Sequence, residues 1–268
     1  MKAADPSSAA NHETVLITGA SSGIGRELAK CFAADGSRLV LTARNTGALQ
    51  SLADELRRAH NVEASVLTAD LARTETPERI FTELQGRGIT VDVLVNNAGF
   101  GAWGKFAGLP LQRQLEMLQV NITALIELTG LFLPGMVQRR RGGILNVASV
   151  AGFVPGPGMA IYYATKACVV SFTEALAEEL AGTNVTVSAL CPGPTVTNFD
   201  QVAHIDKEER KIRMARMSAE AVALYGLRAF RRKRVVAVPG LQNRLIILLS
   251  RCLPRSMVRR TAGKANGI

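Results

Sequence analysis

The sequence predicts an α/β fold, a single doubly wound parallel sheet of about seven strands with helices on both faces. Seven short apolar runs alternate along the chain with segments of helical periodicity, a pattern typical of parallel strands joined by right-handed crossovers. The first run breaks into a glycine cluster and then into a helical pattern. The 268 residues are 47% apolar, which suffices for the core of one large domain. We therefore expect one domain over residues 1–268.

The predicted elements follow one another without a linker long enough to separate domains. Strands are expected at residues 14–18, 37–42, 62–68, 91–95, 143–148, 184–190 and 235–238. Helices are expected at residues 23–35, 45–60, 76–86, 110–138, 160–182 and 218–231. Glycine-containing and polar motifs then fall at the carboxyl ends of strands, where sheets of this kind bind ligands.

The glycine cluster follows the first strand. The chain reads Thr18-Gly19-Ala20-Ser21-Ser22-Gly23-Ile24-Gly25, so that a strand, a tight turn and a helix come in order. Such a turn aims backbone N–H groups and the positive end of a helix at one point, which suits a pyrophosphate. The three glycines stand where a side chain would block the turn or the ligand. The candidate phosphate-binding residues are Gly19, Ser21, Ser22, Gly23, Ile24 and Gly25.

A serine, a tyrosine and a lysine form the second motif. Ser149 precedes Tyr162 by 13 residues, and Lys166 follows Tyr162 by four. Positions i and i+4 share one face of a helix, about 5–6 Å apart at Cβ, so Lys166 can hold a positive charge beside the Tyr162 phenol. A nearby cation lowers the pKa of a phenol from its usual value of about 10. Tyr162 could then exchange a proton with a substrate oxygen near neutral pH.

Together these motifs resemble the short-chain dehydrogenase/reductase family. The resemblance is carried by residues 18–25, Asn96-Asn97-Ala98-Gly99, Asn121, Ser149, Tyr162 with Lys166, and Pro192-Gly193, all in the family's order and spacing. It runs from about Thr14 to Phe199 and weakens after Phe199. It implies a Rossmann-type fold and hydride transfer between a nicotinamide cofactor and a ketone or secondary alcohol.

The resemblance also implies roles for single residues. Tyr162 would be the acid or base, and Ser149 would also hydrogen-bond the reacting oxygen. Lys166 would bind the nicotinamide ribose and lower the pKa of the phenol, and Asn121 would hold a water that relays protons outward. Further cofactor contacts are implied at Asp70 and Leu71 after the third strand, at Asn97, Ala98 and Gly99 after the fourth, and at Pro192, Gly193, Thr195 and Thr197 after the sixth.

The residue just past the second strand bears on the choice of cofactor. An acidic residue there would hydrogen-bond the ribose 2′-hydroxyl, whereas an arginine can pair with a 2′-phosphate. This chain has Arg44. We therefore expect NADP(H).

Positive charge is concentrated at the C-terminal end. Residues 201–268 hold 16 Lys and Arg against 4 Asp and Glu, in a chain of net charge +10. Residues 198–231 are expected to form a substrate loop and a helix, and residues 241–268 a basic amphipathic extension whose apolar stretch is too short to span a bilayer. Three interpretations remain open: peripheral membrane contact through 241–260, steering of an acidic substrate, and packing against another subunit.

The remaining features restrict the cellular setting and the partners. Residues 1–12 lack the apolar segment of a signal peptide and are expected to be flexible. Four cysteines without a Cys-x-x-Cys pair indicate reduced thiols, so we expect a cytoplasmic protein, with peripheral contact at the inner membrane face as one interpretation. The three histidines are scattered, so no metal site is expected. No nucleic-acid motif accompanies the charge, so no nucleic-acid partner is expected. By the family resemblance, the long helices at 110–138 and 160–182 imply a homodimer or homotetramer.

The leading hypothesis is an NADP(H)-dependent oxidoreductase acting on a ketone or secondary alcohol, with a lipid-like 3-oxoacyl compound as substrate. The enzyme alternative is a 3-hydroxy-acid or hydroxy-amino-acid dehydrogenase. That alternative requires a compact anionic site close to Tyr162, whereas a lipid-like substrate requires a long apolar groove. The alternative from another class is a non-catalytic dinucleotide-binding sensor or scaffold. Such proteins usually lose one catalytic residue, and all four are present here.

Overall fold

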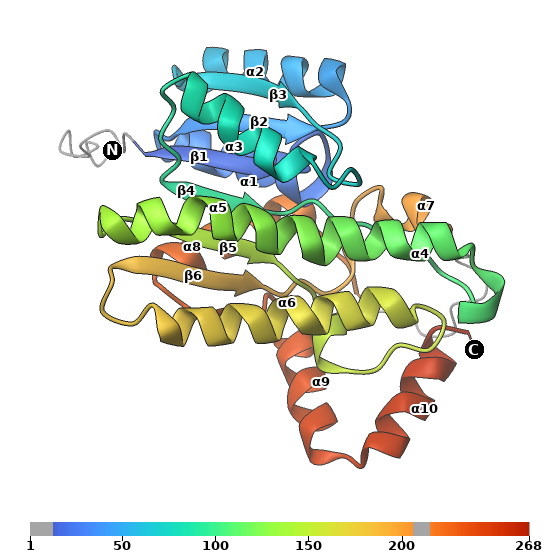
Figure 1. Cartoon of the computed structure of the whole chain (residues 1–268). Helices are drawn as coiled ribbons and strands as arrows, with labels where there is room; N and C mark the ends of the chain where they lie inside the picture. The colour runs from blue at the N-terminus through green and yellow to red at the C-terminus, as the bar shows by residue number, and fades with distance from the viewer. Residues whose placement is uncertain (1–12, 206–214, 268) are drawn as a thin grey trace, which may run out of the picture.

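A seven-stranded parallel sheet forms the centre of the molecule (Figure 1). The structure, a computed structural model, describes residues 13–205 and 215–267. The strand order is β3-β2-β1-β4-β5-β6-β9, and all six pairings are parallel. The strands are β1 (Thr14–Thr18), β2 (Arg38–Ala43), β3 (Ala64–Thr68), β4 (Val93–Asn96), β5 (Gly142–Val147), β6 (Val185–Leu190) and β9 (Val236–Ala237). The predicted doubly wound fold and its seven strands are confirmed.

Helices cover both faces of the sheet, because successive strand residues point to opposite sides. In β1, Val15 and Ile17 belong to the core cluster that also contains residues of α1, α2 and α8, whereas Leu16 belongs to the cluster on the other side, with residues of α3, α5 and α6. Figure 1 shows α5 and α6 lying across the near face. The helices are α1 (Gly23–Ala34), α2 (Thr46–His60), α3 (Thr76–Gly86), α4 (Leu111–Leu118), α5 (Ala124–Gln138), α6 (Ala160–Glu179) and α8 (Ala219–Arg231).

The strand order reverses direction between β1 and β4. From β1 the chain builds β2 and β3 on one side, and from β4 it builds the remaining strands on the other. The two crossover helices that leave β1 and β4 therefore diverge and open a crevice at the carboxyl ends of these strands. The glycine cluster that follows β1 and the Asn97-Ala98-Gly99 segment that follows β4 both lie at this crevice.

The helix predicted at 110–138 forms over Leu111–Gln138 but is not α-helical throughout. A π-helical turn, η2 (Gln119–Thr123), separates α4 from α5, and the amide of Ala124 donates to the carbonyl of Gln119 five residues earlier. Periodicity does not reveal such a turn, because it inserts one residue without changing the composition. By length and composition the run Leu111–Gln138 could span a membrane. Leu128 and Met136, however, are fully buried against the sheet, as in the core helix of a globular protein.

The C-terminal extension folds into a helical hairpin. It consists of α9 (Leu241–Cys252) and α10 (Arg255–Ala265), which project from the body of the molecule beyond α6 (Figure 1). The segment after β6 contains α7 (Phe199–Val202) and a two-stranded pair, β7 (Thr195–Val196) with β8 (Met217–Ser218). The expectations for residues 1–12 and for the central part of the substrate loop, 206–214, fall outside the described residues.

Candidate active site

The glycine turn after β1 is held by side chains of the neighbouring strand ends. The Thr18 hydroxyl accepts from the backbone N–H groups of Asn97 and Ala98, both at 3.0 Å. The Asn97 amide donates to the carbonyl oxygens of Thr18 and Gly19, at 2.9 and 3.1 Å. The Asn97 side chain therefore fixes the turn itself, a role that the sequence did not reveal.

Two glycines of this turn are required by its geometry. Gly19 has φ +66°, which favours glycine, and a Cβ there would lie 2.9 Å from Ala98 Cα. A Cβ on Gly25 would lie 2.3 Å from Asn97 Nδ2, closer than atoms can approach. Because these positions carry no side chain, α1 packs directly on the turn and the backbone on its other side stays open to the cleft.

The polar ends of β2 and β3 form the next part of the cleft. Arg44 is exposed and makes no ion pair with any described residue. The carboxylate of Asp70 accepts from the backbone N–H of Ala72 at 3.1 Å, which fixes the turn after β3. Arg44, Asp70 and Leu71 all line the same cleft as the glycine turn.

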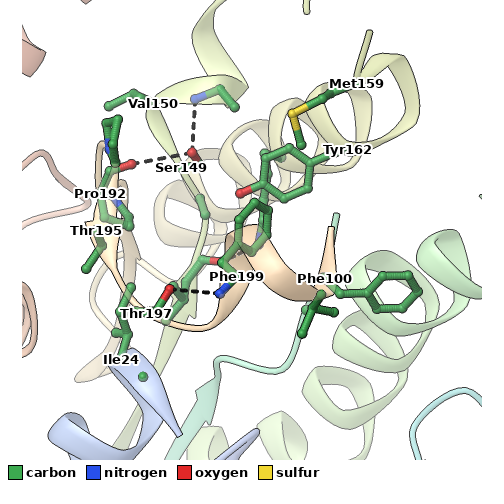
Figure 2. A pocket seen from close by; sticks show the side chains of 18 of the residues that line it. Ile24, Phe100, Ser149, Val150, Met159, Tyr162, Pro192, Thr195, Thr197 and Phe199 are labelled. Atoms are coloured by element: carbon green, nitrogen blue, oxygen red, sulfur yellow. Dashed lines mark hydrogen bonds between the residues drawn. The ribbon is translucent and has the colours of Figure 1, made fainter. Parts of the chain in front are cut away.

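Ser149 and Tyr162 point into the cleft from opposite elements. Ser149 caps a short 3₁₀ helix, η3 (Val150–Phe153): its hydroxyl accepts from Ala151 N at 3.1 Å and donates to Pro192 O at 3.4 Å. Tyr162 lies in the first turn of α6. Figure 2 shows the two side chains turned toward one another in the pocket.

Lys166 lies one helical turn behind Tyr162, as its spacing predicts. Its Nζ is 5.8 Å from the centre of the Tyr162 ring and donates to the carbonyl oxygen of Val147 at 2.7 Å. The side chain is buried. Burial lowers the pKa of the Lys166 ammonium to about 8, and the nearby Cys191 thiol opposes that shift. A lysine so buried keeps its charge only in a site that can stabilise it.

Asn121 lies in the π turn, behind the wall of the cleft. Its amide nitrogen donates to Phe100 O at 2.9 Å and to Thr165 Oγ1 at 3.1 Å, and its Oδ1 accepts from Phe100 N at 3.0 Å. A Cβ on Gly99 would lie 3.1 Å from Asn121 Oδ1 and 3.5 Å from Lys166 Nζ. Asn121 thus adjoins Lys166. Both amide hydrogens of Asn121 are donated to protein acceptors. A water of the expected proton relay would therefore have to bind to the main chain of Asn121 or to the second lone pair of its Oδ1.

The segment after β6 closes the cleft opposite the glycine turn. A Cβ on Gly23 would lie 3.1 Å from Thr197 Cγ2, so the two segments meet. The Thr195 hydroxyl donates to Gly193 O at 2.9 Å. A Cβ on Gly193 would lie 2.4 Å from Asn243 Oδ1, so α9 packs closely on this segment.

The resulting cleft has a volume of about 1260 Å³. It brings together every predicted site residue except Gly25, which packs beneath the turn, and Asn121, which lies behind the wall. This volume exceeds the roughly 300–1,000 Å³ of ordinary ligand pockets. The cleft can therefore accommodate a dinucleotide and a second ligand.

Several cleft residues were missed because their contacts are not local. The Phe199 ring of α7 packs on Tyr162 at a tilt of 52°, with the ring centres 5.1 Å apart (Figure 2). The hairpin adds a further wall, to which Ile246, Leu249, Leu253 and Val258 contribute apolar side chains. Its C-terminal end is fixed by Asn266, whose carbonyl accepts from Trp103 Nε1 at 3.1 Å. The sequence pattern shows that residues 241–253 are apolar, but it does not predict which surface of the protein they contact.

Comparison with known proteins identifies the family. Residues 13–208 match the short chain dehydrogenase family. The chain belongs to the short-chain dehydrogenase/reductase family. It is 35% identical over 187 residues to the 3-oxoacyl-(acyl-carrier-protein) reductase FabG of Aquifex aeolicus, an alignment that covers 70% of this chain and 75% of that protein.

Solved structures of the family agree with this assignment. The short-chain dehydrogenase from Sphingobium yanoikuyae in complex with NADPH has a TM-score of 0.81 at 35% identity, covering 90% of this chain and 93% of the other. A short-chain dehydrogenase/reductase from Burkholderia phymatum in complex with NAD has a TM-score of 0.81 at 28% identity, covering 90% and 94%. The protein is a nicotinamide-dependent oxidoreductase of this family, which acts on a ketone or a secondary alcohol.

Proposed function

We propose that the protein is an NADP(H)-dependent oxidoreductase whose substrate is a lipid-like ketone or alcohol of the 3-oxoacyl type. Two features of the cleft fit a dinucleotide: the bare backbone at Gly19 and Gly23, and the backbone N–H groups at the start of α1. Arg44 supports NADP(H), because its guanidinium is exposed at the cleft edge without a protein partner among the described residues and can pair with a 2′-phosphate.

The catalytic residues are assigned from their positions. The nicotinamide, when bound, supplies or accepts the hydride. In the reducing direction Tyr162 donates its hydroxyl proton to the substrate oxygen, and Ser149 donates a hydrogen bond to the same oxygen. The positive charge of Lys166 favours the phenolate that remains. Asn121 fixes the loop at Phe100 and adjoins Lys166, from where the phenolate regains a proton through water.

The extent of the cleft carries the substrate assignment. Beyond Tyr162 it continues along α9 and α10, where Ile246, Leu249, Leu253 and Val258 line it. The groups packed on Tyr162 are themselves apolar, with Phe199 and Met159 beside the phenol ring. A small hydroxy acid would need a cation at this point to hold its carboxylate, but the arginines that line this part of the cleft, Arg113 and Arg216, are already paired with Glu116 and Asp200. A long acyl chain would instead be surrounded by apolar side chains.

The sensor alternative is disfavoured by the intact catalytic group. Asn121, Ser149, Tyr162 and Lys166 are all in place, and the last three line one cleft. A protein that only bound the dinucleotide would have no need of a serine and a tyrosine facing each other.

We further propose that the chain acts as a homodimer or homotetramer. Leu125, Leu128 and Leu176 cannot form that interface, because the core of the single chain already buries them. The outer side of the same helical layer exposes Leu111, Leu115 and Ile126 instead, and these are available to a second copy. A lipid-like substrate would also agree with the membrane contact expected at residues 241–260.

The proposed function is tested by titrating the purified protein with NADPH and NADH and then measuring carbonyl reduction. The substrate panel runs from short keto acids to long-chain 3-oxoacyl thioesters. Preference for NADPH with turnover that rises with chain length supports the proposal. Turnover of short keto acids alone would favour the hydroxy-acid dehydrogenase, and tight cofactor binding without any turnover would favour the sensor.

A further inference from the structure

The hairpin helix α9 presents three different faces. One face is anchored on the body: Asn243 and Ile247 are buried, and Asn243 Nδ2 donates to Pro239 O at 2.7 Å. Arg244 and Arg251 reinforce this anchor by lying over the rings of Tyr225 and Phe153, at 5.7 and 6.0 Å. A second face lines the cleft. These contacts hold the hairpin in one orientation on the body.

The third face of α9 is apolar and points to solvent. Leu241, Leu245 and Leu248 recur at i, i+4 and i+7, the spacing of one helical stripe. Their exposed fractions are 81%, 55% and 59%. The patch continues through Leu249 and on to Leu253 and Met257 at the turn of the hairpin, exposed to 50%, 44% and 52%. These six exposed apolar side chains run along α9 to the turn of the hairpin, two of them, Leu249 and Leu253, at the border of the cleft, and mark an interaction surface.

The same hairpin is strongly basic. Residues 241–268 contain six Arg and Lys and no Asp or Glu. On α10 the cations occupy the side turned away from the cleft, and none of them makes an ion pair with a described residue. These four cations are Arg255, Arg259, Arg260 and Lys264.

We propose that the α9–α10 hairpin docks this enzyme on an anionic bilayer surface. The leucine stripe of α9 enters the boundary between headgroups and acyl chains, and the cations of α10 contact lipid phosphates. An exposed apolar stripe on one helix, followed by a helix with unpaired cations, has the composition of segments that lie in a membrane interface. A second copy of the chain fits this surface poorly, because it would bring the same uncompensated cations together.

Docking also explains why the cleft extends to the hairpin. Ile246 and Leu249 line the cleft on α9, beside the stripe of Leu245 and Leu248 that faces solvent. With the stripe in the bilayer, the cleft opens next to the acyl chains, so a lipid-like substrate passes from the membrane to Tyr162 without crossing water. This consequence rests on the proposed function, whereas the docking itself does not.

Co-sedimentation of the full-length protein with vesicles tests the docking. We expect binding to vesicles of phosphatidylcholine with phosphatidylglycerol, little binding to phosphatidylcholine alone, and weakening of the binding as salt is raised. The double variant Leu245→Glu/Leu248→Glu should lower the partition coefficient about 10-fold or more. The charge reversal Arg259→Glu/Arg260→Glu should lower it as well. Leu224→Glu, on α8 and exposed to 39%, is the matched control that should bind like the wild type.

Cofactor binding and the reduction of a small water-soluble ketone are measured on the same variants, since neither Leu245 nor Leu248 lines the cleft. Unchanged values there confirm that the variants are folded and separate a failure of docking from a failure of the proposed function. The proposal is overturned if the wild-type protein does not bind anionic vesicles. It is also overturned if the leucine variant and the Leu224→Glu control bind these vesicles equally. If the wild type forms dimers that the leucine variant does not form, the surface binds a second copy instead. If the wild type binds an acidic carrier protein stably but does not bind vesicles, the surface binds that carrier protein instead.

Discussion

Lys166 Nζ donates a hydrogen bond of 2.7 Å to the carbonyl oxygen of Val147. Val147 is the last residue of β5, two residues before Ser149, and Lys166 lies one turn after Tyr162 on α6. One contact therefore joins the strand that carries the serine to the helix that carries the tyrosine. It also holds a cation in a buried position, where its charge acts on the phenol with little screening by water.

The buried lysine predicts a pH dependence of stability. In the folded protein the pKa of Lys166 falls to about 8, below its ordinary value of 10.5. Burying the charged ammonium therefore costs folding free energy. This cost is full below pH 8, where Lys166 is protonated in both states, and it disappears as the pH rises through 10.5, where the unfolded chain also loses the proton. The stability of the wild type relative to Lys166→Met should rise over this window by about 3 kcal/mol. Urea unfolding of both proteins across the window measures it. Parallel stability curves would contradict the assignment.

The packing under the glycine turn predicts the effect of a single methyl group. In Gly25→Ala the new Cβ would lie 2.3 Å from Asn97 Nδ2, so the amide must leave the turn that it holds. We expect a loss of about 1–3 kcal/mol of stability, together with much weaker dinucleotide binding. Gly86→Ala, where no atom lies within 4 Å of the new Cβ, is the control. Thermal unfolding and cofactor titration measure both effects, and a Gly25→Ala protein that binds like the control would refute this view of the turn.

The exposed guanidinium of Arg44 predicts the cofactor preference. Arg44→Ala removes a charge-assisted pair with the 2′-phosphate, worth about 1.5–3 kcal/mol. NADPH should therefore bind about 10- to 100-fold more weakly, while NADH binding changes little. Arg73→Ala, which removes an exposed arginine that does not line the cleft, serves as the control. An equal loss of affinity for both cofactors would mean that Arg44 does not recognise the phosphate.

The packing of the Phe199 ring on Tyr162 predicts an effect of Phe199 on substrate specificity. The two ring centres lie 5.1 Å apart, and the Phe199 ring also lies against Gly101. Phe199→Ala opens space beside the reacting phenol, so kcat/KM for branched ketones should rise about 10-fold relative to a linear ketone of equal length. Gln201→Ala, a truncation on the same short helix at an exposed residue that does not line the cleft, should leave the ratio unchanged. If Phe199→Ala instead lowers kcat for all ketones alike, the ring positions Tyr162 and does not select the substrate.

The sequence predicted the sheet and most of the cleft because both depend on local patterns. Each strand lies in a mainly apolar run, Gly19 and Gly23 lie at a spacing set by the turn, and Tyr162 and Lys166 lie at a spacing set by the helix. What it missed depends on contacts between distant residues. Phe199 reaches Tyr162 only because α7 folds back over the cleft. The destination of the C-terminal extension depends on single contacts, such as that of Trp103 with Asn266, 163 residues apart.

The role of Asn97 illustrates the same limit. Its place after β4 marked it as a cleft residue, and it does line the cleft. Its amide, however, is occupied by Thr18 and Gly19, 79 and 78 residues earlier in the chain. Sequence spacing could not reveal these partners, since only the pairing of β1 with β4 brings them together.

The most direct test of the account is to compare Tyr162→Phe with the wild type in NADPH binding and in carbonyl reduction. The variant removes only the hydroxyl, so the ring keeps its packing against Phe199. The account predicts NADPH affinity within about 2-fold of the wild type and a fall of kcat by about 100-fold or more, the contribution of a positioned proton donor. A Tyr162→Phe protein that still reduces its ketone at close to the wild-type rate would contradict the assignment of Tyr162 as the proton donor.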